Sequence, residues 1–438
     1  MAANYPSEAI EEARQRRQLL RAILASTVGT AIEWYDFFLY STVTGLVFAR
    51  LYFPQSDPLV GTIEAFGVYT VGFVARPIGA AIFGHYGDRL GRKTALVVTL
   101  LMMGIATFLV ALVPGYRYIG IWGAVLLTLL RFLQGIGVGG EWGGSVLLAM
   151  EWARSNRHRG FIASWPQFGV PAGLFLANLA VLVLSAISGD EFLTWGWRVP
   201  FLLSAVLIAL GLYIRLGIHE TPVFARLRAE RRVERQPVLE VIRRQPREIL
   251  LIALCRTAEQ APFYLFTSFV FVYGVDVLRL PRDLILASVL GAAVLSFFSI
   301  PFFGYLSDRI GRKRVYMFGA AITAVWGFAY FGLLDTRVPH LAAIAIVLSL
   351  LPHDIMYGPQ AALIAESFPG RLRYSGASLG YQLSSLIAGG PAPLIATALL
   401  SRYHSATPLA VFVLICAVIS LVSTAMLQEH ANKELSNN

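Results

Sequence analysis

Charged side chains inside long apolar segments are the residues of this sequence best placed to do chemistry. Glu33 and Asp36 lie three positions apart in one such segment, so on a helix they share one face. An ionisable group at mid-membrane costs roughly 2.5–3.5 kcal/mol, so it normally faces a cavity and has a function. Two carboxylates held this close without full solvation suit proton uptake. The alternative is a static ion pair with Arg76 or Arg131.

Three arginines in apolar segments are candidate ligands for an organic anion. Arginine stays charged and its planar fork matches a carboxylate, which suits Arg76, Arg131 and Arg256 to this role. Gln134 lies on the same helical face as Arg131 and could bind the same ligand. Each arginine could instead be neutralised within the protein, and Arg256 could simply pair with Glu259, three positions later.

His353 and Asp354 are adjacent in another apolar segment. Histidine titrates in the physiological range, although a lone histidine in an apolar helix is more often a hydrogen-bonded structural residue. Consecutive residues point in different directions, so only one of the two need line a cavity. Tyr35, Tyr381 and Gln382 could offer hydrogen bonds or a stacking surface to a ring, but each is individually explained by packing. The proton-coupling candidates are therefore Glu33, Asp36, Glu259, His353 and Asp354.

The segments that carry these residues are predicted to cross a membrane. The chain is 56 % hydrophobic and 14 % charged, whereas a soluble domain is about 25 % charged. Apolar runs of about 18 or more residues recur from end to end, long enough to span a bilayer as helices and too long for barrel strands. We expect an all-α integral membrane protein with twelve spans, over 22–49, 60–85, 94–113, 120–150, 160–187, 196–217, 248–275, 283–307, 314–334, 340–366, 374–400 and 407–427.

The net charge of +10 lies in alternate loops, which argues against a nucleic-acid-binding surface. Positive loops stay in the cytoplasm, so both termini are expected inside, and an even number of spans is required. The basic groups fall at 14–21, 89–93, 154–159, 226–247, 309–314 and 371–373. The other loops hold isolated arginines.

A repeated loop divides the chain into two similar halves. Residues 84–93 (GHYGDRLGRK) and 304–313 (GYLSDRIGRK) match at six positions and lie half a chain length apart. Parallel repeats of six spans are typical of transporters with a site between two bundles. We expect an N-terminal tail, an N-terminal bundle, a linker, a C-terminal bundle and a C-terminal tail, over 1–21, 22–217, 218–247, 248–427 and 428–438.

These motifs resemble those of the major facilitator superfamily, whose G-x-x-x-D-R-x-G-R-K loop is present in both halves. Closer features resemble its metabolite:proton symporter family, and within it the shikimate and α-ketoglutarate permeases. They are 30–37 (TAIEWYDF), 76–79 (RPIG), 131–135 (RFLQG), 139–144 (GGEWGG), 192–198 (FLTWGWR), 220–222 (ETP), 353–354 (HD), 373–377 (RYSGA) and 380–382 (GYQ). The resemblance implies that spans one, four, seven and ten line a central cavity, and all four carry intramembrane charge here.

The resemblance also implies that the two repeated loops form a gate. Their aspartates can cap a helix or pair with arginine across the bundles, while the simpler explanation is that basic residues hold a loop inside the cell. The gating candidates are Asp88, Arg89, Arg92, Asp308, Arg309 and Arg312.

The combined prediction is a secondary active transporter of the inner membrane, functional as a monomer and not an enzyme. It would couple uptake of a small carboxylate to the proton gradient by alternating access, with no cofactor, metal or nucleic acid. A zwitterionic osmolyte such as proline or betaine, and proton-independent exchange, remain alternatives. A membrane enzyme or sensor would need a catalytic constellation or signalling domain, and the sequence offers neither.

Overall fold

A computed structural model describes residues 5–56, 58–152, 158–217, 220–230 and 237–431. The secondary structure of these residues consists of helices. They form twelve membrane-crossing segments in two bundles, as predicted.

The N-terminal bundle has six long helices joined by short helical turns. The turns are η1 (Thr44–Phe48), α2 (Ala49–Tyr52), α5 (Tyr116–Ile119) and η3 (Gly189–Leu193). The long helices are α1 (Tyr5–Val43), α3 (Pro58–Leu90), α4 (Arg92–Val110), α6 (Trp122–Glu151), α7 (Arg159–Ser188) and α8 (Arg198–Leu216). Two short helices follow before the second bundle, α9 (Pro222–Ala229) and α10 (Pro237–Arg244).

The C-terminal bundle repeats this order, but three of its six crossing segments are interrupted. The seventh consists of α11 (Pro246–Cys255), α12 (Thr257–Tyr264) and η4 (Leu265–Phe269), followed by η5 (Val272–Val277). The others are α13 (Arg282–Ile310), α14 (Arg312–Asp335), α15 (Pro339–Leu348) with α16 (Leu350–Glu366), α17 (Arg373–Ser384) with η6 (Ser385–Gly389) and α18 (Pro391–Tyr403), and α19 (Thr407–Met426).

Prolines account for the interruptions in the tenth and eleventh crossing segments. A proline has no N–H to donate to the carbonyl four residues earlier. Pro352 therefore cannot form a helical hydrogen bond with the Leu348 carbonyl, and α15 ends at Leu348. Pro391 does the same to Ile387, within the π-helical turn η6. Pro262 lies in α12, just before the π-helical η4. Such irregular backbone is tolerated at membrane depth only where protein buries it, and these turns therefore mark the interior of the bundle.

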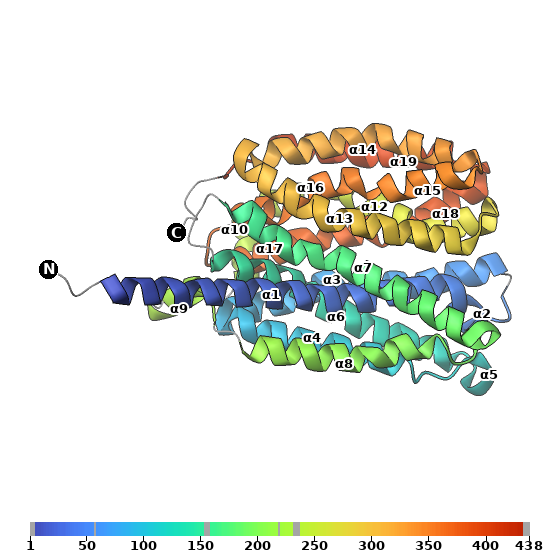
Figure 1. Ribbon diagram of the computed structural model, residues 1–438, viewed down its shortest axis with the longest axis horizontal. Coiled ribbons are helices and arrows are strands. Elements are labelled where there is room, and N and C mark those ends of the chain that lie inside the picture. Colours follow the sequence, from blue (N-terminus) through green and yellow to red (C-terminus); the bar gives the residue numbers. More distant parts are fainter. Residues whose placement is uncertain (1–4, 57, 153–157, 218–219, 231–236, 432–438) are drawn as a thin grey trace.

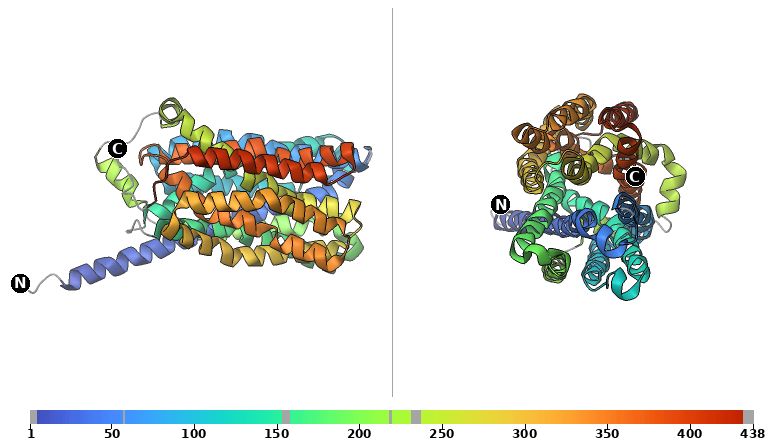
Figure 2. Two further views of the ribbon diagram at one scale, coloured as in Figure 1. Left: turned by 90° about the horizontal axis from the view of Figure 1, so that it is seen from above. Right: turned by 90° about the vertical axis from the view of Figure 1, so that its right-hand side faces the viewer.

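The two bundles lie side by side with their long axes roughly parallel (Figure 1, Figure 2). Contacts between bundles run along α7 with α13 and α16, and along α17 with α3 and α6. We call the end at which α1 begins and α19 ends the terminal face, and the opposite end, where α2 and α5 lie, the far face (Figure 1).

The outer surface of the bundles is apolar, as a lipid-facing surface must be. Phe298, Val325 and Val206 are each at least 65 % exposed. Among the described helices, eleven are long and apolar enough to cross a membrane. The twelfth crossing segment is α1, whose apolar part carries Glu33 and Asp36.

The first helix is longer than the sequence indicated. The polar tail expected over 1–21 is helical from Tyr5, continuous with the first crossing segment, because its Glu, Ala, Arg, Gln and Leu residues favour helix. The helix extends beyond the bundle at the terminal face (Figure 2).

Candidate functional site

Arg131 places a buried guanidinium among three aromatic rings of the N-terminal bundle. It lies on α6, and its Cζ is 4.7 Å from the ring centre of Phe37, 4.5 Å from Tyr40 and 4.7 Å from Tyr69. Its Nη1 donates to Gln134 Oε1 at 3.2 Å, while its Nη2 is buried without a hydrogen-bond partner. Cation–π contacts of this kind are worth about 2 kcal/mol when desolvated.

Arg76 on α3 is held in the same way. Its Cζ lies 4.4 Å from the Phe73 ring centre, 4.6 Å from Phe37 and 5.7 Å from Trp34, and its Nη2 also has no hydrogen-bond partner. Within the described residues, no ion pair joins Arg76 or Arg131 to a carboxylate. The static pairing with Glu33 or Asp36 that we considered from the sequence is therefore not present.

Glu33 and Asp36 are both buried in α1. Both carboxylate oxygens of Asp36 and Oε2 of Glu33 have no hydrogen-bond partner in the structure. The nearby hydroxyl of Tyr35 donates to the Pro200 carbonyl at 2.8 Å, which ties α1 to α8. Tyr35 thus has a packing contact, whereas the two carboxylates still have unsatisfied acceptors.

A buried ion pair between Glu141 and Arg215 was missed by the sequence reasoning. Arg215 of α8 contacts Glu141 of α6, which also accepts hydrogen bonds from Thr99 at 2.8 Å and Ser145 at 2.9 Å. The available signal was the one used for Arg131, a charge inside an apolar segment, and both residues fell within predicted spans. Because the pair is well satisfied, it fixes α6 against α8.

In the C-terminal bundle the charged candidates form one hydrogen-bonded cluster. Arg256 Nη2 lies 2.9 Å from Glu259 Oε2, and Gln360 donates to the same oxygen at 3.0 Å. His353 lies between two carboxylates, with Nε2 at 3.4 Å from Glu259 Oε1 and Nδ1 at 2.9 Å from Asp354 Oδ1. The pairing of Arg256 with Glu259 that the spacing suggested is present.

The His353 ring is held by aromatic neighbours and its partners by further hydrogen bonds. Its centre lies 4.7 Å from that of Phe263 and 4.8 Å from that of Tyr357. Asp354 also accepts a hydrogen bond from Ser299 on α13. His353 and Asp354 are therefore joined to each other and also reach different partners, so both belong to the cluster.

A stack of side chains joins this cluster to the N-terminal bundle. The Tyr381 ring of α17 lies parallel to Trp142 of α6, with ring centres 3.7 Å apart and planes 16° apart. On Tyr381, the Arg256 guanidinium carbon is 3.3 Å from the ring centre. Gln382 also crosses between bundles, donating to the Val138 carbonyl at 3.3 Å. These contacts occupy Tyr381 and Gln382 in the interface between bundles.

Aromatic contacts also join the bundles on the far-face side of Arg256 and Glu259. Trp34 contacts Phe263 with ring centres 6.3 Å apart, and Phe73 contacts Tyr264 at 5.2 Å. Nearer the far face, the hydroxyls of Ser41 and Ser268 are 3.0 Å apart. Along α12, Phe263 and Tyr264 follow Arg256 and Glu259 toward the far face, so these rings lie between that pair and the far face.

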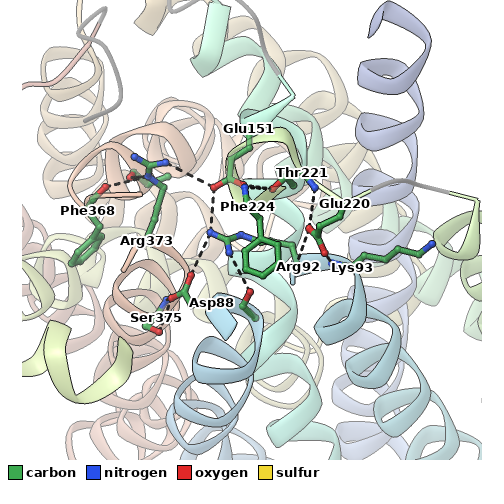
Figure 3. A network of polar contacts seen from close by, with 12 residues as sticks. Asp88, Arg92, Lys93, Glu151, Glu220, Thr221, Phe224, Phe368, Arg373 and Ser375 are labelled. Carbon is green, nitrogen blue, oxygen red and sulfur yellow. Dashed lines mark hydrogen bonds and ion pairs between the residues drawn. The ribbon is translucent and has the colours of Figure 1, made fainter. Parts of the chain in front are cut away.

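At the terminal face, each repeated loop holds a helix of the other bundle. Asp88 Oδ2 accepts hydrogen bonds from the Ser375 backbone N–H at 3.0 Å and hydroxyl at 2.8 Å, at the start of α17. Arg92 lies 3.3 Å from Asp88 and 3.5 Å from Glu151 (Figure 3). Arg373 of the other bundle approaches Glu151 at 3.9 Å.

The second loop repeats these contacts with the halves exchanged. Asp308 accepts from the Gly160 and Phe161 N–H groups at 2.9 Å each, at the start of α7. Arg312 forms an ion pair with Asp308 at 2.6 Å. Glu366 forms ion pairs with Arg312 and with Arg159 of the N-terminal bundle, at 3.4 Å each. We call the two sets of contacts the terminal latches.

Two predicted gating residues lie outside these latches. Arg89 is exposed and its Nη1 is 3.2 Å from His85 Nε2 on its own helix. Arg309 likewise contacts Tyr305 of its own helix. The first arginine of the repeated motif is thus exposed in both halves, while Asp88, Arg92, Asp308 and Arg312 are buried.

Known proteins resemble the chain over nearly its whole length. The Major Facilitator Superfamily profile matches residues 26–379 and 284–437. The shikimate transporter of Escherichia coli (strain K12) is 40 % identical over 93 % of this chain and 94 % of its own. The inner membrane metabolite transport protein YhjE of the same strain is 38 % identical over 95 % of each.

Two further similarities bear on substrate and fold. The proline/betaine transporter of Salmonella typhimurium is 32 % identical over 95 % of this chain and 85 % of its own. A structure of the proton:xylose symporter XylE superposes with a TM-score of 0.76 at 17 % identity, covering 96 % of this chain and 98 % of that one. The fold, the repeated latches and these relatives agree: the chain belongs to the major facilitator superfamily, among the metabolite transporters related to the shikimate transporter.

Proposed function

We propose that the protein imports a small organic acid together with protons by alternating access, without a cofactor. The observation that carries this proposal is the unequal pairing of the buried arginines. Arg76 and Arg131 each have a buried Nη2 without a hydrogen-bond partner and, among the described residues, no direct ion pair, whereas Arg256 lies 2.9 Å from Glu259. An incoming carboxylate would accept hydrogen bonds from these two guanidinium groups.

The proton site is assigned to the C-terminal cluster around His353. Each nitrogen of its ring lies next to a carboxylate, Glu259 at Nε2 and Asp354 at Nδ1. The ring can therefore exchange a proton with either of these two carboxylates. Glu259 holds Arg256, and Arg256 lies on Tyr381. Neutralising Glu259 weakens its hold on Arg256 and so loosens the stack with Trp142 between the bundles. The link from proton to conformation therefore runs through a continuous set of contacts.

The terminal face is assigned to the cytoplasm, with both termini inside. The basic residues of the latches and linker lie at this face, and positive segments stay in the cytoplasm. The latches close this side, and Ser41 meets Ser268 nearer the far face, so opening toward the cell exterior requires the bundles to separate at the far face while the latches hold.

Uptake into proteoliposomes tests the proposal. Purified protein is reconstituted with the interior at neutral pH, and radiolabelled shikimate, α-ketoglutarate and citrate are added outside at acidic pH. We expect one of these acids to accumulate above its external concentration, and an uncoupler to abolish that accumulation. Uptake that ignores the pH gradient contradicts proton coupling and indicates exchange.

A zwitterionic substrate is the second candidate, because proline/betaine transporters are 31–32 % identical to this chain. The same vesicles distinguish the two substrate classes. Accumulation of betaine, with none of the carboxylates, would replace the organic-acid proposal.

A further inference from the structure

A cavity of about 350 Å³ opens between the bundles near the far face, outside the cluster of buried charges. Its size suits a small-molecule ligand. Ser41 and Ser268 line its inner part, and Arg50 of α2 and Arg282 at the start of α13 also line it. The hydroxyls of Ser41 and Ser268 lie 3.0 Å apart across the two bundles, and the cavity lies where these bundles meet.

Arg282 is the side chain that most needs a ligand here. It is half-buried, yet its Nε and Nη2 are buried atoms without a hydrogen-bond partner. Its nearest aromatic ring, Phe192, also lines the cavity, with its centre 6.0 Å from the guanidinium carbon. A buried donor without a partner loses its hydrogen bonds to water without replacement, and the loss is larger when the group is charged. A carboxylate in the cavity removes that penalty.

Among the described residues, the acidic side chains that line the cavity form no ion pair with Arg282. Asp276 is exposed, but the protein partly desolvates its carboxyl group, and this raises the pKa of Asp276, while the charges of Arg279 and then Arg50 lower it. Arg279 and Arg50 are thus the arginines that act on Asp276. Asp190 is exposed at the rim. The charge of Asp283, next in the chain, acts on Arg282, but among the described residues it leaves Nε and Nη2 of Arg282 without a hydrogen-bond partner. These donors therefore remain for a ligand.

Two threonine hydroxyls in the wall indicate what else the ligand carries. Thr42 uses its hydrogen on Asn178 Oδ1 at 3.2 Å, and Thr267 uses its hydrogen on the Phe263 carbonyl at 2.7 Å. Since both hydrogens are used, their oxygens remain as acceptors. Acceptors match the O–H groups of a hydroxylated acid and offer nothing to the methyl groups of a quaternary ammonium.

We propose that this cavity is an entry site that holds a hydroxylated carboxylate, with its carboxylate on Arg282 and its hydroxyls on Thr42 and Thr267, before the ligand reaches Arg76 and Arg131. The substrate class rests on the proposed function. The site's preference for anions does not, and it is measurable without transport.

Cysteine labelling measures that preference. Val275 lines the cavity and is half-buried, while the native Cys255 and Cys416 are buried. Val275→Cys protein is treated with anionic 2-sulfonatoethyl or cationic 2-(trimethylammonium)ethyl methanethiosulfonate, with rates normalised to free 2-mercaptoethanol. We expect the anionic reagent to react about tenfold faster. Shikimate should slow labelling, and betaine at the same concentration should not.

Charge variants assign the effect to Arg282. Arg282→Gln should remove both the anion preference and the protection by shikimate. It should also raise the KM for uptake several-fold with kcat preserved, and Arg282→Lys should restore part of the difference. Arg402→Gln removes another exposed arginine at the far face, outside the cavity lining, and should change neither measurement.

The outcomes separate this inference from the proposed function. Equal normalised rates in Val275→Cys overturn the entry site, even where carboxylates accumulate in vesicles. An equal loss of preference in Arg402→Gln overturns the assignment to Arg282. Anion preference with shikimate protection but no carboxylate accumulation supports the site and removes the transport proposal. Protection by betaine alone overturns the hydroxylated carboxylate as ligand.

Discussion

Arg131 contacts three ring faces, the Gln134 amide and, through Nε, the Tyr69 carbonyl at 3.4 Å, so its identity matters beyond its charge. Lysine would keep the charge and lose both the fork and the flat surface that packs on Phe37, Tyr40 and Tyr69. Losing about 2 kcal/mol of such contact corresponds to about thirtyfold in affinity.

We therefore expect Arg131→Lys to raise the KM for the carboxylate by about thirtyfold and Arg131→Gln to abolish uptake. Initial rates in proteoliposomes measure both. Arg117→Gln, a change at an exposed far-face arginine, serves as the control. Wild-type kinetics in Arg131→Lys would show that the guanidinium shape is not used.

Glu259 is expected to matter for coupling more than for binding. Glu259→Gln keeps a hydrogen-bonding group beside Gln360 but leaves Arg256 without its counter-charge and His353 without one carboxylate. Proton-driven accumulation should disappear, while counterflow of substrate at equal pH persists at a rate within about tenfold of wild type, as expected when only one link of a coupled cycle is removed. The control is Glu240→Gln, which removes an i,i+4 pair with the exposed Arg244 worth about 0.3–0.5 kcal/mol. Full accumulation by Glu259→Gln would exclude this residue from coupling.

Residue types revealed which charges were buried, but the sequence did not reveal their partners. Arg256 with Glu259 and His353 with Asp354 could be anticipated because neighbours on one helix set the geometry. Trp142 on Tyr381 could not, because that stack depends on how two helices from different bundles approach. Glu141 and Arg215 were within reach of the same reasoning and were overlooked.

The helices of the latches show a similar division between local and long-range information. The repeated loop was readable because its six shared residues recur in order. The helix starts that it holds, at Ser375 and at Gly160, are contacts across more than 140 positions of the chain, and local sequence carries no signal for them. The interruptions at Pro352 and Pro391 follow from the missing N–H. The predicted spans did not include these interruptions, because hydropathy carries no information about backbone hydrogen bonds.

Loss of either latch aspartate should open the terminal face. Asp88→Asn and Asp308→Asn each remove a charge that accepts two hydrogen bonds from a helix start, a contact of about 0.5–2 kcal/mol. Spin labels at Thr94→Cys and Arg314→Cys, which are exposed on opposite bundles, should report a larger distance in either variant by double electron–electron resonance. Asp283→Asn, at the first turn of α13 on the far face, should leave the distance distribution unchanged. An unchanged distribution in both latch variants would exclude them from the gate.

At the scale of the whole molecule, transport by two rocking bundles requires the far face to separate where Ser41 meets Ser268. The 3.0 Å between these hydroxyls places the positions well for a disulfide, which needs close Cβ atoms. The double variant Ser41→Cys/Ser268→Cys should lose uptake on oxidation and regain it with dithiothreitol. Each single variant should be insensitive to oxidant. Undiminished uptake by the fully crosslinked protein would mean that substrate passes without this separation.

The exchange of partners between the latches bears on how tightly the membrane is sealed. Asp88 belongs to the first bundle and holds a helix of the second, while Asp308 does the reverse, so neither contact can open without straining the other. The free energies that oppose opening then add, and the population open at the terminal face falls by about tenfold for each 1.4 kcal/mol of their sum. Removing one latch leaves the other to oppose opening, so the double variant should open further than either single variant.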